Sequence, residues 1–444
     1  MSSLEMKRHV RRGEMKMMTV VPSDDEEEED VVVYDGSHII RTPNGREIKS
    51  IVDRTNERGL SPSDQASSEG CCMNSSFTFL QTNRVIGYSR INWLLLAMPL
   101  AIISYFANFG DGPTFLFSLL ALIPQAQLLG LFTEQVALYT NDAIGGLLNA
   151  TFGNLTELII SILALRKDMM RIVQVSLLGS ILSNCLLVLG SAFLLGGLRH
   201  SSQKFNTQMA TTNSGLLMVS TMAMLLPAAL DAADEERSAA SVLSFSRFTA
   251  MLLLGVYGLL MYFQIKTHRH LLLEDEENDD EEEEEQILTL KEAIIWLAID
   301  TALISFFSEL LVGSIEGSAA AWNVPKVFIG VIVIPIVGNA AEHASAVIVA
   351  MKGKMELSLG IAFGSAVQIA LFGVPVAVIV AWMMGKRLSL DFHVFETAVV
   401  LVSTLAVGFL VGDGESNYLK GAMLVVAYII VSAAFFVHKD EEGT

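Results

Sequence analysis

Long apolar stretches separated by short polar hinges make up most of the chain from about residue 92 onward. Each stretch is close to the roughly 20 residues that a helix needs to cross a bilayer. The runs lie near 92–109, 114–138, 143–165, 172–197, 212–230 and 243–264, and then near 292–312, 327–350, 357–383, 393–411 and 418–437. This pattern predicts an all-α, polytopic membrane protein with about 11 transmembrane helices.

The two halves of this pattern repeat each other. Residues 145–184 align without a gap on residues 330–369 at a constant offset of 185, and 8 of the 40 pairs are identical. The identities include Gly153-Asn154-x-x-Glu157 with Gly338-Asn339-x-x-Glu342, and Gly179-Ser180 with Gly364-Ser365. With helix 1 set apart, each repeat holds five spans, and an odd number forces the second copy into the opposite orientation. We therefore expect helix 1 followed by two inverted five-helix repeats.

Composition and charge indicate which parts of the chain lie outside the membrane. The chain is 52% hydrophobic yet carries a net charge of −19, and the acidic blocks at 24–35 and 274–285 account for the whole imbalance. The chain has no basic stripe, which argues against nucleic-acid binding. We divide it into a disordered cytosolic tail (1–88), helix 1 with the first repeat (89–265), an acidic cytosolic linker (266–290), and the second repeat with a short C-terminus (291–444). The cytosolic N-terminus follows from the lack of an apolar signal segment in the first 30 residues.

Two glutamates stand near the middle of apolar spans at equivalent positions of the repeats. Glu157 and Glu342 each follow a Gly-Asn pair by three residues. A carboxylate at the bilayer centre costs about 2.5–3.5 kcal/mol or more, so it marks a functional site by default. A protonated Glu that only bonds neighbouring helices is the alternative, but two such residues at matched positions argue against it.

Neutral oxygen ligands surround these glutamates in the sequence. Each Asn lies on the same helix face as its Glu, and a Gly-Ser follows each Glu by 22 residues. The candidate binding residues are Glu157, Glu342, Asn154, Asn339, Ser180, Ser365 and Gln368. Carboxylates among neutral oxygens suit a hard cation such as Ca²⁺, whereas Zn²⁺ prefers His or Cys. Taken singly, an Asn or Ser in a membrane helix is more often a contact between helices.

The same site can also carry protons, because a carboxylate holds either a proton or a cation. His343 adds an imidazole that titrates near neutral pH when unperturbed. It lies about 100° around the helix from Glu342, which favours a pathway-lining residue over a metal ligand. A packed core histidine is the alternative interpretation.

Glu134 and Glu309 form a second acidic pair, near the ends of spans 2 and 7. They could gather cations at an entrance, or they could be ordinary charges at the membrane interface. No zinc-protease motif H-E-x-x-H and no nucleotide-binding loop occurs in the chain. We therefore expect a transporter and not an enzyme, with no cofactor and with transport driven by an ion gradient or passive.

The segments G-L-L-N-A-T-F-G-N-L-T-E-L-I (146–159) and P-I-V-G-N-A-A-E-H-A (335–344) resemble the signature repeats of the cation/proton exchanger family of vacuolar Ca²⁺/H⁺ antiporters. L-L-G-S-I-L-S-N (177–184) and G-S-A-V-Q-I (364–369) resemble the family too. The resemblance covers about residues 91–437. It implies Glu157 and Glu342 as ligands of Ca²⁺ and protons, and a role for His343 in proton coupling. Members of the family often carry a regulatory N-terminus, but the tail of this chain has no matching motif. Gln127 stands where the family usually has Glu.

Together these features indicate a secondary antiporter that moves Ca²⁺ from the cytosol into a vacuole or another acidic organelle against protons. Its partners would be the lipid bilayer and Ca²⁺, with Mn²⁺ or other divalent cations left open, as are the stoichiometry and the oligomeric state. The alternatives are a Na⁺- or K⁺-coupled Ca²⁺ exchanger, a passive cation channel, and a membrane-anchored Ca²⁺ buffer. The buried glutamates argue against the buffer, and the inverted repeats argue against the channel.

Overall fold

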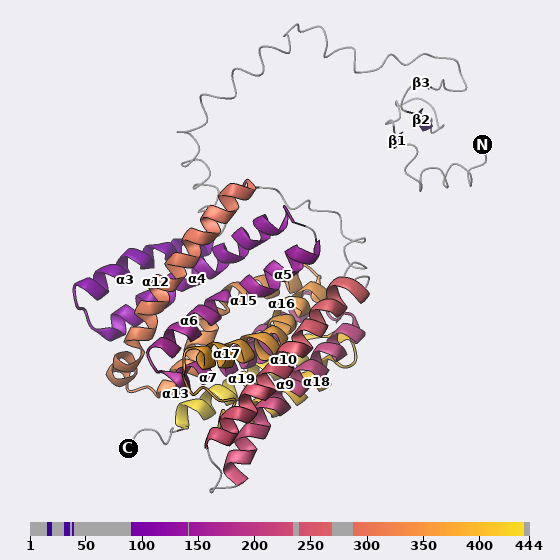
Figure 1. Ribbon diagram of the computed structural model, residues 1–444. Coiled ribbons are helices and arrows are strands. Elements are labelled where there is room, and N and C mark those ends of the chain that lie inside the picture. Colours follow the sequence, from indigo (N-terminus) through magenta and orange to yellow (C-terminus); the bar gives the residue numbers. More distant parts are fainter. Residues whose placement is uncertain are drawn as a thin grey trace. The chain divides into compact units, whose positions relative to one another are not determined.

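The computed structural model describes residues 16–19, 31–35, 38–39, 90–140, 142–233, 239–268 and 287–438. From residue 90 onward the described chain is built almost entirely of helices (Figure 1). The chain divides into two units, Met1–Leu80 and Gln81–Thr444, which we describe separately.

The first unit contains three short strands. They are β1 (Lys16–Thr19), β2 (Val31–Asp35) and β3 (His38–Ile39), and they pair antiparallel in the order β1-β2-β3. The rest of the predicted tail (1–88) and most of the predicted acidic linker (266–290) lie outside the described residues. Disorder of the tail and the place of the linker stay predictions.

The second unit begins with helix 1 and the first repeat. Its elements are η2 (Arg90–Leu96), α3 (Ala97–Phe106), α4 (Asp111–Ala137), α5 (Asp142–Phe152), α6 (Leu155–Arg166), α7 (Met170–Leu182), η3 (Ser183–Val188), α8 (Leu189–Arg199), β4 (Gln203–Lys204), α9 (Thr207–Ala233), α10 (Ala239–Tyr262) and η4 (Phe263–Thr267). The second repeat follows with α12 (Leu290–Trp322), α13 (Lys326–Phe328), η6 (Ile329–Val333), α14 (Ile334–Gly338), α15 (Ala340–Met351), α16 (Met355–Gln368), η7 (Ile369–Gly373), α17 (Val374–Met383), α18 (Val394–Val411), β5 (Glu415–Ser416) and α19 (Tyr418–Val437).

Helices coincide with every apolar run that the sequence singles out, so the protein is an α-helical membrane protein as predicted. Within the described residues, eight helices are each long and apolar enough to cross a bilayer. The segments Lys326–Gly338 and Ala340–Met351 meet this condition only as a pair, which is bent by 55°. Helix 1 is a shorter apolar helix over Ile91–Phe106. The number of 11 spans therefore stays a prediction. Helices suit this setting because a bilayer offers no water to bond to free backbone groups.

The repeats are visible in the backbone as well. The π-helical segments η3 and η7 follow α7 and α16 at equivalent positions of the two halves. The two long helices α4 and α12, which open the repeats, pack against each other along their length (Figure 1). Such π-helical turns inside a membrane helix are frequent at functional sites.

Loop contacts define the two ends of the helical unit. At one end the hydroxyl of Tyr139 donates to the carbonyl of Leu288 at 2.8 Å, and His200 Nε2 donates to the carbonyl of Met351 at 3.2 Å. At the other end Lys167 pairs with Glu309 at 2.9 Å. The loops after α8 and α15 therefore meet each other. Because successive spans cross the unit in alternating directions, they lie at the same end as the loop after α4, and the loop after α6 lies at the opposite end.

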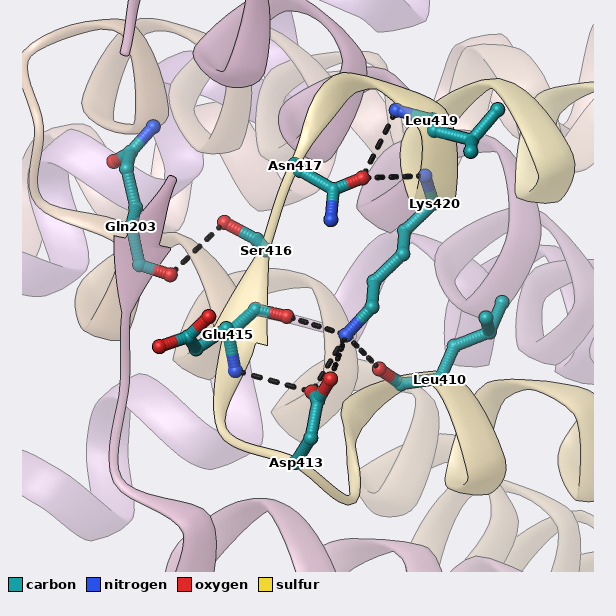
Figure 2. A network of polar contacts seen from close by, with 8 residues as sticks. All are labelled: Gln203, Leu410, Asp413, Glu415, Ser416, Asn417, Leu419 and Lys420. Carbon is teal, nitrogen blue, oxygen red and sulfur yellow. Dashed lines mark hydrogen bonds and ion pairs between the residues drawn. The ribbon is translucent and has the colours of Figure 1, made fainter. Parts of the chain in front are cut away.

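Lys420 stabilises the loop between α18 and α19 through several hydrogen bonds (Figure 2). Its ammonium group donates to both carboxylate oxygens of Asp413 at 2.5 and 2.6 Å, and to the carbonyls of Leu410 and Glu415 at 2.9 and 2.7 Å. The hydrogen bond from Lys420 is the main cause that lowers the pKa of Asp413. Lys420 thus holds the end of α18 beside the β4–β5 pair, where Ser416 Oγ donates to the carbonyl of Gln203 at 3.3 Å.

Glycines let α8 and α19 cross with their backbones in contact. A Cβ on Gly421 would lie 2.1 Å from the backbone nitrogen of Leu194 and 2.7 Å from the carbonyl oxygen of Gly190. No side chain fits into such a gap without moving a helix. Small residues at helix crossings are the usual solution in membranes, where van der Waals packing drives helix association.

Gly421→Ala should therefore destabilise the fold. Overpacking of a tight contact typically costs about 1–3 kcal/mol, and here the obstacle is backbone. We expect a lower thermal unfolding midpoint of the purified protein in detergent. Gly258→Ala in α10 is the matched control, because no atom of the described residues lies within 4 Å of its Cβ position. Equal midpoints for the two variants would contradict the close crossing.

Candidate cation-binding site

Both repeats interrupt a helix at the same sequence position. Asn154 separates α5 from α6, and Asn339 separates α14 from α15. The two asparagines have nearly the same backbone angles, with φ −106° and ψ 19° for Asn154, and φ −93° and ψ 15° for Asn339. The break does not depend on Pro335, because the first repeat is interrupted as well although Ala150 stands at the equivalent position. The Gly-Asn pair that both repeats share is the common feature.

Each break places a carboxylate in the first turn of a half-helix. Glu157 lies in the first turn of α6, and Glu342 lies in the first turn of α15. The N-terminus of a helix carries partial positive charge and unbonded N–H groups, which favour a negative group nearby. Glu157 is 8% exposed, and the two carboxylates are close enough for their charges to interact. A Cβ on Gly338 would lie 3.1 Å from Oε1 of Glu157, so the first repeat reaches the break of the second.

Four amide and hydroxyl side chains connect the two repeats next to the glutamates. Asn154 Nδ2 donates to Oε1 of Gln368 at 2.9 Å, and Ser365 Oγ donates to Oδ1 of Asn154 at 3.0 Å. Asn184 Nδ2 in turn donates to Ser365 Oγ at 3.2 Å. These bonds join α16 of the second repeat to the helix break of the first and to η3.

Several buried polar atoms beside this network have no hydrogen-bond partner among the described residues. They are Oε1 of Glu157, Oε2 of Glu342, Oδ1 of Asn184, and both amide atoms of Asn339. Glu157 and Ser180 line a small cavity together with Ser176, Pro335 and Gly338. A buried polar group without a partner is costly, so such a cluster of free oxygens indicates a place for a ligand.

The structure thus brings together most of the candidate binding residues predicted from the sequence. Glu157, Ser180, Asn154, Ser365 and Gln368 lie in the network or in the cavity. Glu342 and Asn339 lie at the second break, as expected. Their roles as ligands stay a prediction.

His343 contacts Ser191, a residue that the sequence analysis did not single out. Its Nε2 lies 2.7 Å from Oγ of Ser191 in α8. The same hydroxyl lies 2.5 Å from the carbonyl of Leu187, which accepts its hydrogen. Because the hydroxyl has one hydrogen, its oxygen accepts from Nε2 of His343. Val376 occupies the position of the second repeat that is equivalent to Ser191. The repeat therefore gave no signal for Ser191.

The second acidic pair lies away from this site. Glu309 pairs with Lys167 at one end of the helical unit and is 45% exposed. Glu134 lies in the last turns of α4, next to Gln135, whose Oε1 accepts from the backbone nitrogen of Leu288 at 3.1 Å. The two glutamates are therefore near opposite ends. An entrance role for either stays a prediction.

Two further buried acids lie outside the site. Glu396 is fully buried and forms an ion pair with Arg171, which joins the start of α18 to the start of α7. Asp300 in α12 is 3% exposed, and its Oδ2 has no hydrogen-bond partner among the described residues. Neither acid has a counterpart in the other repeat, and the Arg171–Glu396 pair was not predicted.

The donor set fits a hard cation. Within the described part of the chain, no group of three or more His, Cys, Asp and Glu residues could hold a metal ion. The site instead offers two carboxylates with amide and hydroxyl oxygens, which are the ligands that Ca²⁺ prefers. Two carboxylates with few other charges can also be neutralised by protons.

The comparisons with known proteins agree with this geometry. The family described as sodium/calcium exchanger protein matches residues 113–266 and 292–437, which is more than half of the chain. Vacuolar cation/proton exchanger 2 of Arabidopsis thaliana is 48% identical over 365 residues, covering 80% of this chain and 83% of that protein. The chain belongs to the cation/proton exchanger family.

Other members extend this assignment. Vacuolar cation/proton exchanger 3 of Oryza sativa subsp. japonica is 47% identical over 369 residues, covering 81% of this exchanger and 88% of the relative. The structure of native YfkE superposes with a TM-score of 0.68 at 35% identity, covering 78% of this chain and all of YfkE. The H⁺/Ca²⁺ exchanger CAX has a TM-score of 0.61 at 13% identity, covering 81% and 93% of the two chains, and shares the fold.

The two equivalent asparagines should respond differently to substitution. Asn154→Ala removes two hydrogen bonds, leaving Oε1 of Gln368 without its donor and the hydroxyl of Ser365 without its acceptor, which costs about 1–3 kcal/mol. Asn339→Ala removes an amide that is 1% exposed and has no partner among the described residues, so it should cost less or be neutral. Thermal unfolding in detergent without divalent cations measures both. An equal loss in the two variants would contradict the asymmetry.

Proposed function

We propose that this exchanger is a secondary antiporter that moves Ca²⁺ out of the cytosol in return for protons from an acidic organelle. The observation that carries the proposal is the pair of half-helices, one per inverted repeat, that place Glu157 and Glu342 beside free oxygens in the protein interior. No bound cofactor is needed, because the two exchanged ions are the cargo.

The relatives support the choice of ions. Proteins named vacuolar cation/proton exchangers are 48% and 47% identical to this chain over about four fifths of its length. A second structure of YfkE, named there as a Ca²⁺/H⁺ antiporter, is 33% identical to this chain and superposes with a TM-score of 0.66. On this basis we propose the membrane of a vacuole or another acidic organelle as the location of the protein. The cytosolic N-terminus is proposed separately, from the lack of an apolar signal segment in the first 30 residues.

Competition for the two carboxylates couples the ions. When both groups are ionised, they and the neighbouring amide and hydroxyl oxygens offer a cation the hard ligands it needs. When both are protonated, the site is neutral and has little affinity for a divalent cation. If the site changes the side from which it is accessible only in one of these two forms, the protein exchanges one Ca²⁺ for protons. Ser180, Ser365, Gln368, Asn154 and Asn339 would complete the coordination.

An unequal packing of the two repeats supports alternating access. At the end of the unit that holds the loop after α6, η6 and α14 pack against α7. At the other end the equivalent half-helix, α5, packs mainly against α4. The pathway would then be shut on the η6 side, which a cytosolic N-terminus places at the organelle lumen, and accessible from the cytosol.

The proton gradient is sufficient for this work. Each pH unit supplies about 1.36 kcal/mol per proton. Two protons crossing about two units therefore release roughly 5 kcal/mol, which sustains an accumulation of Ca²⁺ of more than about a thousandfold. Membrane voltage changes this figure only when the exchange moves net charge.

Reconstitution distinguishes the proposal from its alternatives. In liposomes with an acidic interior, we expect radioactive Ca²⁺ to accumulate and to be released when an ionophore collapses the pH gradient. Uptake driven by an outward Na⁺ or K⁺ gradient at equal pH would identify a different coupling ion. Equilibration of Ca²⁺ without any accumulation would identify a passive channel. Either result would overturn the proposal.

Charge removal at the shared site should abolish this uptake. Glu157→Gln and Glu342→Gln keep the size of the side chain but can no longer be ionised, so pH-driven uptake should fall to background. The expression level and the elution profile in detergent should stay normal. Glu316→Gln is the control, because Glu316 is an exposed partner of Lys326. Near-normal uptake by either site variant would remove that glutamate from the site.

A further inference from the structure

Asp300 is a buried acid that the proposed exchange at Glu157 and Glu342 leaves unused. It lies in α12, is 3% exposed, and its Oδ2 has no hydrogen-bond partner among the described residues. A carboxylate inside a bilayer is costly unless it is paired or neutral. An acid that is kept there in spite of this cost indicates a function.

The helix pair α4 and α12 fixes where Asp300 lies. At one end of the pair, a Cβ on Gly317 would lie 1.6 Å from Oδ2 of Asp111. Toward the other end, Phe132 stacks on Trp296 with the ring centroids 6.0 Å apart. The two contacts are equally far apart on both helices, from 111 to 132 and from 296 to 317, so the antiparallel pairing keeps its register between them.

Asp300 and Gln125 lie on the faces of the two helices that meet. Asp300 is about one turn from Trp296 on α12, and Gln125 is about two turns from Phe132 on α4. The register places Asp300 level with Leu128, which is within one turn of Gln125. Gln125 is fully buried, and its Oε1 has no hydrogen-bond partner among the described residues. An acid and an amide with free oxygens thus lie at one level of this interface.

The repeat leads to the same pairing. F-T-E (132–134) in α4 matches F-S-E (307–309) in α12, and the same offset makes Gln125 the equivalent of Asp300, with an amide in place of the acid. Equivalent residues of two inverted repeats meet where the two-fold axis passes between them, near the middle of the membrane. Because α4 belongs to one repeat and α12 to the other, any movement between the repeats changes the surroundings of Asp300.

Asp300 lies at the depth of Glu157 but apart from the cation site. Lys167, which ends α6, pairs with Glu309 of α12 at 2.9 Å. Glu157 lies ten residues before Lys167, and Asp300 lies nine residues before Glu309. The charges of Glu157 and Glu342 act on each other, whereas neither acts in this way on Asp300. Asp300 is therefore a separate buried acid.

The helices around Asp300 provide no positive charge to balance it. The helices that pack most closely on α12 are α4, α6, α13 and α3. Lys291, Arg166 and Lys326 are the basic residues of these helices and of α12, and all three lie at helix ends, with Lys291 nine residues from Asp300, about 13 Å along the helix. Apart from Glu157, the other titratable groups also lie toward the helix ends: Tyr105, Asp111, Glu134, Glu292, Glu309 and Glu316. An ionised Asp300 would be uncompensated, so a proton neutralises it in this state.

We propose that Asp300 binds a third exchanged proton, at a site that Ca²⁺ does not occupy. In this site the protonated acid donates to Oε1 of Gln125, a neutral acceptor. Ca²⁺ takes about 6–8 oxygen ligands, far more than one acid and one amide supply. The inference rests on the proposed exchange at Glu157 and Glu342. Three protons then return for each Ca²⁺, so one net positive charge crosses the membrane with the protons.

The accumulation of Ca²⁺ at rest counts the protons. Liposomes with an acidic interior, equal K⁺ on both sides and valinomycin hold the voltage at zero. With a gradient of about one pH unit, three protons sustain a ratio of inner to outer free Ca²⁺ of about 1000, and two protons sustain about 100. We expect the higher ratio for the unsubstituted protein and the lower one for Asp300→Asn. Glu316→Gln, which removes an exposed acid from the same helix, should keep the higher ratio.

Voltage provides an independent count. A K⁺ gradient with valinomycin that makes the interior positive should raise the ratio for the unsubstituted protein, because one charge leaves with the protons. The same voltage should leave the ratio of Asp300→Asn unchanged, because two protons against one Ca²⁺ move no net charge.

An exchange of the acid and the amide tests the placement. Asp300→Asn together with Gln125→Glu moves the carboxylate to the facing helix and keeps both groups in the interface. We expect this double variant to recover both the higher ratio and its voltage dependence. A double variant with a normal elution profile in detergent that stays at the lower ratio would contradict the pairing of Asp300 with Gln125.

The two proposals fail in different ways. If the unsubstituted protein shows no pH-driven Ca²⁺ uptake, the proposed function fails before any variant is measured. If it shows uptake but reaches only the two-proton ratio without a voltage effect, the third proton site fails alone. The same holds if Asp300→Asn keeps the higher ratio. A folded Asp300→Asn protein that takes up no Ca²⁺ also overturns the inference, because both glutamates remain.

Discussion

The structure depends on how a helix can be interrupted inside a bilayer. Lipid offers no partner to a free N–H or carbonyl group, so a break survives only where protein or a polar cavity replaces water. Asn154 and Asn339 mark the two breaks, and each is followed within one turn by a glutamate. The half-helix N-terminus and the carboxylate thus compensate each other. The proposed cation site is a consequence of solving this backbone problem twice.

The two helix breaks have similar backbone conformations but different side-chain hydrogen bonds. Asn154 has partners in Gln368 and Ser365, so the first break is held to α16 by side chains. Asn339 has no side-chain partner among the described residues, although it is nearly as buried. One half of the site is therefore preorganised by the protein, while the other half keeps free atoms for a ligand. In the proposed function, the first break would hold its ligands in place, and the second would supply the atoms that respond to the occupant.

Much of this arrangement could be predicted from the sequence because a few constraints act locally. Apolar length fixes the spans, and the repeat of Gly-Asn-x-x-Glu fixes which two carboxylates belong together. The contact between His343 and Ser191 could not be predicted, because it joins helices without any shared pattern. The same holds for the buried ion pair of Arg171 and Glu396, whose partners lie 225 positions apart. The sequence also gives no sign of which repeat is closed, since equivalent residues can be buried in one and exposed in the other.

The unequal packing of the two repeats has its own basis in the sequence. The face of α7 under η6 carries Val175, a fully buried apolar side chain, where the equivalent face of α16 carries Gly360. Apolar contact area and dispersion hold helices together in a membrane, and valine supplies both where glycine supplies neither. The η6–α7 contact therefore has apolar side-chain area that the equivalent face of α16 lacks. In the proposed alternating access, this contact favours the state in which the η6 side of the pathway is closed.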